Sequence, residues 1–208
     1  MPSNDDDATL DHGTRIPPIS HAQWTDEVRQ VLASFSVPFS QYGLNGDESE
    51  KDNLSPILST VLQNPALARV YFPFADYVLR KSSLHPRHTR ILILRVAWLW
   101  RFEVEWAQHA AMAVRDHWLT EDEVKHVARG STDSGWSDVE VLLIIAVNQM
   151  HKSSNIDHET WQALSCELSV QQMVDLTFTI GSYVLAGMYM NCFSLPLKEG
   201  QKGFKEFQ

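Results

Sequence analysis

Apolar side chains recur along this chain at the three- and four-residue spacing of amphipathic helices, and no stretch alternates with the period of a half-buried strand. Capping boxes at Thr120–Glu123 and Ser169–Gln172, and a terminating Gly130, punctuate the pattern. The predicted helices cover residues 20–35, 56–62, 65–79, 86–117, 120–130, 138–151, 157–167 and 169–193. We therefore expect an all-α fold, a single helical domain of about seven or eight helices.

The two ends of the chain differ from this helical middle. Residues 1–14 are polar and acidic, with aspartate at positions 5, 6 and 7, and are expected to be a disordered N-terminus. Residues 199–208 are expected to be a C-terminal tail, so the predicted domain covers residues 15–198. The acidic start is the opposite of the basic and then apolar start of a signal peptide, which favours a cytoplasmic protein.

Composition narrows the class of protein further. The chain has 208 residues, 17 Lys and Arg against 26 Asp and Glu, and a net charge of −9. Because basic residues neither dominate nor cluster, no nucleic-acid partner is expected. The uncharged run Leu176–Leu197 is long enough to span a bilayer, but its Thr, Ser, Asn and Pro residues favour a buried or subunit-contacting helix, with no membrane partner.

The two cysteines also limit the possible chemistry. Cys166 and Cys192 lie too far apart in sequence for a CxxC redox pair or a cysteine-based zinc site. Both have apolar neighbours, which predicts buried thiols in a reducing compartment. No HExxH, P-loop, dinucleotide or GxSxG motif occurs, so we expect neither a metal site nor a cofactor.

The stretch 86–117 carries the candidate chemistry. If it forms one helix, Trp98, Phe102, Glu105 and His109 line one stripe, and the last two, four residues apart, can meet. A carboxylate and an imidazole among aromatic rings form an acid–base candidate. Burial disfavours the charged forms whereas mutual contact favours the charged pair, and the sequence leaves both open. The alternative is an ordinary surface pair of a helix.

Further candidates surround this pair or lie on the last helix. Tyr183 and Asn191, eight residues apart, could share a pocket-facing stripe, although core or interface roles remain open. Arg95 or Arg90 could pair with a substrate carboxylate if either faces the pocket. The candidate catalytic residues are His109, Glu105 and Glu103, and the candidate substrate-binding residues are Trp98, Phe102, Trp106, Arg95, Tyr183 and Asn191.

The stretches Pro86–Ala97 and Phe102–His109 resemble the carboxymuconolactone decarboxylase family, which shares an all-helical fold with the alkyl-hydroperoxidase D (AhpD) proteins. The resemblance continues through Leu119–Val124 and Phe178–Tyr183 and covers roughly residues 15–198. Its most specific part is the Glu-x-Glu-Trp-x-x-His pattern that ends at His109. The resemblance implies an AhpD-like fold and a homotrimer or homohexamer assembled through helices such as residues 169–193.

Departures from the family pattern are equally informative. The peroxidase branch carries a CxxC pair four and seven residues before the histidine, where this chain has Glu105 and Phe102. Disulfide-cycle peroxidase chemistry is therefore expected to be absent. Arg90 replaces a glutamate of that branch's proton relay, and Asn148-Gln149 replaces an Asp-Glu pair.

The resemblance implies acid–base work by His109. We expect a cofactor-independent lyase or isomerase acting on a small oxygenated acid, lactone or polyketide-like substrate. His109 would shuttle a proton at a carbon next to a carbonyl, with Glu105 orienting or activating it. Decarboxylation, dehydration and isomerisation share that step and stay open. The alternatives are a non-catalytic oligomeric ligand-binding or assembly protein and a residual hydroperoxidase.

Overall fold

The computed structural model describes residues 13–34, 55–132 and 135–207, which form nine α-helices and no strand. The helices are α1 (Asp26–Ser34), α2 (Pro56–Val61), α3 (Pro65–Asp76), α4 (Pro86–Leu99), α5 (Glu103–Arg115), α6 (Glu121–Arg129), α7 (Asp138–Ser153), α8 (His158–Glu167) and α9 (Val170–Cys192). The predicted all-α class is confirmed. The disorder predicted for residues 1–14 falls almost entirely outside the described residues.

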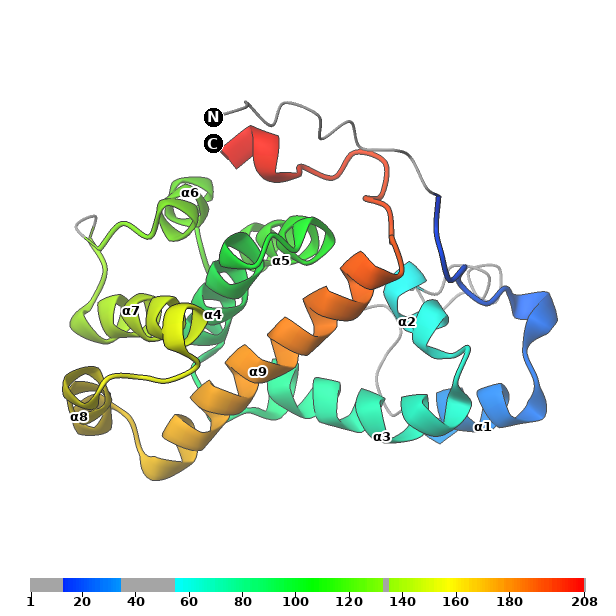
Figure 1. The fold of residues 1–208 in the computed structure, drawn as a ribbon, viewed down its shortest axis with the longest axis horizontal. Coiled ribbons are helices and arrows are strands. Elements are labelled where there is room, and N and C mark those ends of the chain that lie inside the picture. Colours follow the sequence, from blue (N-terminus) through cyan, green and yellow to red (C-terminus); the bar gives the residue numbers. More distant parts are fainter. Residues whose placement is uncertain (1–12, 35–54, 133–134, 208) are drawn as a thin grey trace, which may run out of the picture.

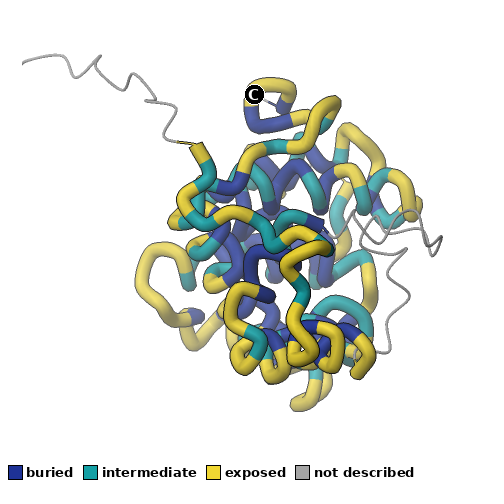
Figure 2. Tube along the Cα trace, turned by 90° about the vertical axis from the view of Figure 1, so that its right-hand side faces the viewer, coloured by how far each residue is buried: buried dark blue, intermediate teal, exposed yellow. Residues whose placement is uncertain are grey.

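Helix α4 is the centre of the packing. It contacts α5, α6, α7 and α9, and every residue from Thr89 to Ala97 is buried. Helix α9 crosses the molecule between α3 on one side and α4 with α5 on the other (Figure 1). Buried stretches gather in the interior while exposed stretches form the outside (Figure 2). The apolar run Ile91–Leu94 is therefore buried on all sides of the helix.

The single long helix predicted for residues 86–117 is wrong, because α4 and α5 are separate helices. Between them Arg101 adopts a left-handed conformation, with φ of 61°, and the Phe102 N–H donates to the Ala97 carbonyl at 2.8 Å. This is the hydrogen bond of a Schellman helix end, where glycine is the usual residue. The Arg101 guanidinium lies 4.1 Å from the ring centroid of Phe204, a cation–π contact that stabilises the turn.

Residues beyond 198 pack against the domain. Phe204 and Phe207 are buried in a 3-10 turn against the aromatic rings of Trp98 and Trp106. The Phe204 N–H also donates to the Glu103 carboxylate at 3.0 Å. The packed unit therefore extends to Phe207, past the predicted boundary at 198.

The prediction of buried thiols is wrong, because Cys166 and Cys192 are both exposed and unbonded. Cys166 lies on the solvent side of α8, whose Thr160 and Leu164 face the interior. Cys192 is the last residue of α9. The apolar sequence neighbours of each cysteine did not predict its burial, because adjacent residues of a helix lie on different faces.

Helix α9 combines core and surface character. Among the described helices it is the one long and apolar enough to cross a membrane, and 56% of its most apolar stretch is buried within the chain. Gly187 permits close packing with the start of α5, since a Cβ at that position would collide with the Phe102 ring. Contact with α5 places this helix beside Glu105 and His109.

The Arg87 guanidinium connects three helices. It donates to Glu123 at 2.7 Å, to Glu140 at 2.5 Å and to the Trp118 carbonyl at 2.8 Å. Both glutamates are the third helical residues (N3) of capping boxes, at the starts of α6 and α7. One side chain on α4 therefore fixes the N-termini of two neighbouring helices.

We expect Arg87→Met to lower the free energy of unfolding by about 2 kcal/mol, because two partly buried carboxylates lose their cation. Urea unfolding followed by circular dichroism measures the change. The matched control is Lys125→Met, which removes an exposed pair with Asp122 and should leave stability unchanged. Equal effects of the two substitutions would contradict the role of Arg87.

Candidate active site

Three buried polar side chains form a continuous chain of contacts between α4 and α5. The Glu105 Oε1 and His109 Nε2 atoms are 3.0 Å apart, and Arg90 Nη1 lies 2.8 Å from His109 Nδ1. The exposed fractions of the three side chains are 3%, 5% and 9%. The sequence prediction that Glu105 and His109 meet on one helix face is therefore correct, and Arg90 completes the set.

The contacts define the protonation state of His109. A guanidinium has only donors, so Nδ1 of His109 must accept, and the ring proton must lie on Nε2, where it is donated to Glu105. Burial lowers the pKa of His109, and the Arg90 charge lowers it further, against an opposing effect of Glu105. His109 is thus a neutral imidazole with both nitrogens occupied.

Glu105 offers one free oxygen. Its Oε2 atom is buried and has no hydrogen-bond partner among the described residues. The side chain lines a cavity of about 60 Å³ that lies between α2, α3, α5 and α9. A buried carboxylate oxygen without a partner is costly in a folded protein and indicates a site where a ligand atom completes the hydrogen bonding.

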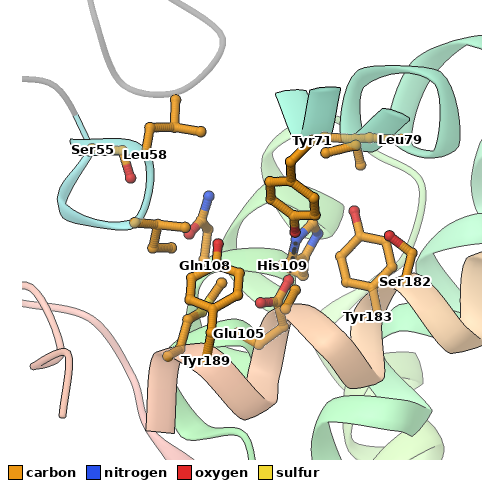
Figure 3. A pocket seen from close by; sticks show the side chains of 14 residues that line it. Ser55, Leu58, Tyr71, Leu79, Glu105, Gln108, His109, Ser182, Tyr183 and Tyr189 are labelled. Carbon is orange, nitrogen blue, oxygen red and sulfur yellow. Dashed lines mark ion pairs between the residues drawn. The ribbon is translucent and has the colours of Figure 1, made fainter. Parts of the chain in front are cut away.

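Three tyrosines surround this carboxylate (Figure 3). The Tyr183 ring packs edge-on to the His109 imidazole at 5.1 Å, and the rings of Tyr71 and Tyr189 are perpendicular at 6.0 Å. Burial, and the nearby Tyr71 and Glu105, raise the pKa of Tyr189 well above its usual value. Tyr189 is therefore a protonated donor beside the carboxylate.

Several candidates from the sequence lie away from this cavity. Trp98 and Trp106 pack against each other at 4.9 Å and are covered by Phe204 and Phe207. Phe102 packs against α9 at Gly187. The break between α4 and α5 explains the difference, because it turns the predicted common stripe into two separate faces.

Arg95 serves the fold. Its Nη1 donates to the Val127 and Ala128 carbonyls at 3.0 and 2.7 Å, at the C-terminal end of α6, and its Nε donates to Asn148 at 2.8 Å. A cation at a helix C-terminus is stabilised by the helix dipole. The residue that departs from the family pattern, Asn148, thus accepts from a buried arginine that does not face the cavity.

Two further polar candidates have partners elsewhere. Asn191 Nδ2 donates to the Arg101 carbonyl at 3.3 Å, and Glu103 accepts from the Phe204 backbone. Of the predicted substrate-binding residues, the structure places Tyr183 alone among the described cavity-lining side chains.

Sequence reasoning did not find Tyr71 and Gln108, which also line the cavity. Gln108 lies next to His109, and no sequence motif pointed to it. Tyr71 lies in an otherwise apolar stretch, so a phenol at a core-like helix position was the available signal. The contact of Tyr71 with α9 depends on tertiary packing, which the sequence pattern does not show. Among the described residues, no group of three or more His, Cys, Asp or Glu is placed to hold a metal ion.

Solved structures share this fold. A peroxidase-related protein of Ralstonia eutropha, described as an alkylhydroperoxidase AhpD core, is 15% identical with a TM-score of 0.71, over 94% of this chain and 95% of that chain. A peroxidase-related protein of a Silicibacter species is 11% identical with a TM-score of 0.70, over 89% and 92%. The debrominase Bmp8 is 12% identical with a TM-score of 0.72, over 90% and 94%.

These likenesses show that the chain has the AhpD-like fold, as the sequence resemblance implied. No model of a protein family and no curated protein sequence matches the chain. A further crystal structure contains debrominase Bmp8 in complex with a tribromopyrrole.

We expect the His109 ring to stay neutral, with its proton on Nε2, at the pH where an ordinary imidazole becomes protonated. An ordinary imidazole gains a proton near pH 6.5. Because the folded-state pKa is lowered, the unfolded chain binds this proton first, so the free energy of unfolding falls as pH drops below about 6.5. Nitrogen NMR of the ring and urea unfolding at several pH values measure both effects.

A His109→Gln variant should show a shallower pH dependence of stability. Burial also lowers the pKa of His88, so some dependence remains. A proton on Nδ1 of His109 at neutral pH would contradict the arrangement with Arg90.

Proposed function

We propose that the protein is a cofactor-independent lyase or isomerase that transfers a proton at a carbon next to a carbonyl. The substrate class is a small oxygenated acid, lactone or polyketide-like compound. The observation that carries the proposal is the Oε2 of Glu105, which is buried without a partner among the described residues, in a cavity that Tyr183 and Tyr189 also line. Crystal structures of a debrominase with the same fold favour a catalytic role over a purely structural one.

In this proposal Glu105 is the group that accepts and returns the proton. His109 donates its Nε2–H to the other carboxylate oxygen, and Arg90 holds the imidazole in that tautomer. The roles are therefore exchanged relative to those expected from the sequence, where His109 shuttled the proton. The reason is that neither nitrogen of His109 is free to reach a substrate.

Tyr189 supplies the second requirement of such a reaction. Removing a proton next to a carbonyl places negative charge on the carbonyl oxygen, and a phenol in a low-dielectric site stabilises that charge. An ordinary phenol is protonated at neutral pH, and burial raises the pKa of Tyr189 further. Return of the proton to another carbon completes an isomerisation, and loss of a leaving group from the neighbouring carbon completes an elimination.

Two alternatives follow from specific features. A non-catalytic ligand-binding protein would use the same cavity without proton transfer. A residual hydroperoxidase is disfavoured because both thiols, Cys166 and Cys192, are exposed and neither lines the cavity.

We expect Glu105→Gln to lower the rate of proton exchange roughly a hundred- to ten-thousandfold. The assay incubates the protein in D₂O with a panel of simple ketones and lactones and follows deuterium incorporation next to the carbonyl by mass spectrometry. The matched control is Glu167→Gln, at an exposed position on α8. Exchange that survives in Glu105→Gln would refute the assignment, and absence of exchange for every compound would favour the non-catalytic alternative.

We also propose a homotrimer or homohexamer that forms through the N-terminal part of α9. Val170, Val174 and Phe178 are 83%, 52% and 58% exposed, and this apolar row points away from the chain's own core. The Phe178 ring contacts Phe74 of α3 at 6.4 Å, which extends the apolar surface onto a second helix.

We expect Phe178→Glu to convert the assembly to a monomer, because a carboxylate buried between subunits loses its hydration. Light scattering measures the mass. Lys152→Glu, on an exposed position of α7, is the control. A wild-type chain that is monomeric at high concentration would contradict the proposal.

The proposal includes a cytoplasmic location. Cys166 and Cys192 are exposed and unpaired, and exposed free thiols persist in reducing compartments.

A further inference from the structure

A second, larger cavity lies directly beside the Glu105 cavity. It has a volume of about 340 Å³ and is formed by α2, α3 and the C-terminal half of α9, with Ile16 at its edge. Tyr71 and Tyr189 line both cavities, so their perpendicular rings form the wall between the two. We name the larger cavity the outer groove.

The described lining of the outer groove is uncharged and mainly apolar. Among the lining residues that the structure describes there is no Asp, Glu, Lys, Arg or His. Two of its polar side chains already have partners: Gln63 donates to the Pro17 carbonyl at 2.9 Å, and Asn64 accepts from the Leu67 N–H at 3.1 Å. A ligand therefore meets mainly side chains such as Val61, Leu67, Leu185 and Phe193.

The volumes show that the inner cavity cannot hold a whole substrate. A space of 60 Å³ accommodates a few waters or a single functional group. The outer groove, in contrast, has the volume of a small-molecule site, which begins at about 300 Å³. A compound that extends across both would put its reactive group beside Glu105 and its remainder among apolar side chains.

Charge defines the class of compound. The lining of the inner cavity, as far as the structure describes it, contains the Glu105 carboxylate and no lysine or arginine. The nearest buried cation, Arg90, is bonded to His109. An anionic substrate would face this carboxylate without a counter-ion among the described lining residues of either cavity, at a large electrostatic cost.

We propose that the outer groove binds the apolar part of the substrate, which is a neutral ketone or lactone with an alkyl or aryl tail. Its carbonyl end reaches Glu105 when the contact between the Tyr71 and Tyr189 rings opens. This inference rests on the proposed function of the Glu105 site and narrows its substrate class, from acids and lactones to neutral carbonyl compounds.

The first test measures binding of Nile red, a neutral apolar fluorophore, by fluorescence titration. We expect Leu67→Glu and Leu185→Glu each to weaken binding at least tenfold, because a carboxylate enters the apolar lining. The matched controls are Val70→Glu and Met188→Glu on the same two helices. All four residues are 49–67% exposed, but the controls do not line the groove. Equal loss in both pairs, or no loss in either, would overturn the proposal.

The second test uses γ-lactones with alkyl tails of increasing length as competitors of Nile red. Each added methylene should tighten binding about fourfold until the groove is filled. Linear alkanoic acids of matched length should bind at least tenfold more weakly, because their carboxylates face Glu105. Acids that bind as well as lactones, or affinities independent of tail length, would overturn the proposal.

The two proposals fail in different ways. Nile red binding requires no turnover. Glu105→Gln should therefore lose deuterium exchange but still bind Nile red. If exchange depends on Glu105 while Leu67→Glu still binds Nile red normally, the groove assignment fails and the catalytic one stands. If Glu105→Gln keeps both properties, the catalytic assignment fails. Light scattering provides a last check: if Leu67→Glu lowers the mass of the assembly, the groove is a contact between copies, which overturns its ligand role.

Discussion

Two buried guanidinium groups on α4 determine how the other helices can pack around it. A guanidinium carries five N–H donors and no acceptor, so burying it without acceptors costs several kcal/mol. Arg95 meets this requirement with backbone carbonyls at the end of α6 and with Asn148 of α7. Arg90 meets part of it with the imidazole of His109 on α5 and with the carboxylate of Asp116, which lies 3.9 Å away. The neighbours of α4 are therefore positioned by polar contacts as well as by apolar packing.

The same requirement connects the core to the candidate chemistry. Because Arg90 occupies Nδ1 of His109, the imidazole can only donate from Nε2, and Glu105 is the acceptor. In the family that the sequence resembles, the peroxidase branch has a glutamate at the Arg90 position and a thiol at the Glu105 position. Both ends of the polar chain thus differ in charge from that branch, while the central histidine is kept. The Glu105 carboxylate takes the place of the reactive thiol, and the Arg90 guanidinium contacts the opposite side of the His109 imidazole.

The sequence predicted the helices well because a helix with one buried face has apolar residues at a spacing of three and four. It failed where a helix ends without glycine or proline. Arg101 adopts a left-handed conformation that is supported by Phe204, about a hundred residues further along the chain. Because this break was not predicted, the sequence pattern placed Trp98 and Glu105 on one face of a single helix. The i,i+4 spacing of Glu105 and His109 was sufficient to predict their contact, whereas the convergence of Tyr71 with Tyr189 depends on how α3 packs beside α9.

The packing of residues 204–207 has a consequence for the order in which the molecule forms. Glu103 and Phe204, which are joined by a hydrogen bond, are 101 positions apart in the chain. During synthesis α4 and α5 emerge long before the segment that covers Trp98 and Trp106. Until that segment arrives, the aromatic face beside the first turn of α5 stays open to other apolar surfaces, including those of other nascent chains. Contacts of such long separation also slow folding, because a large loop must close before they form.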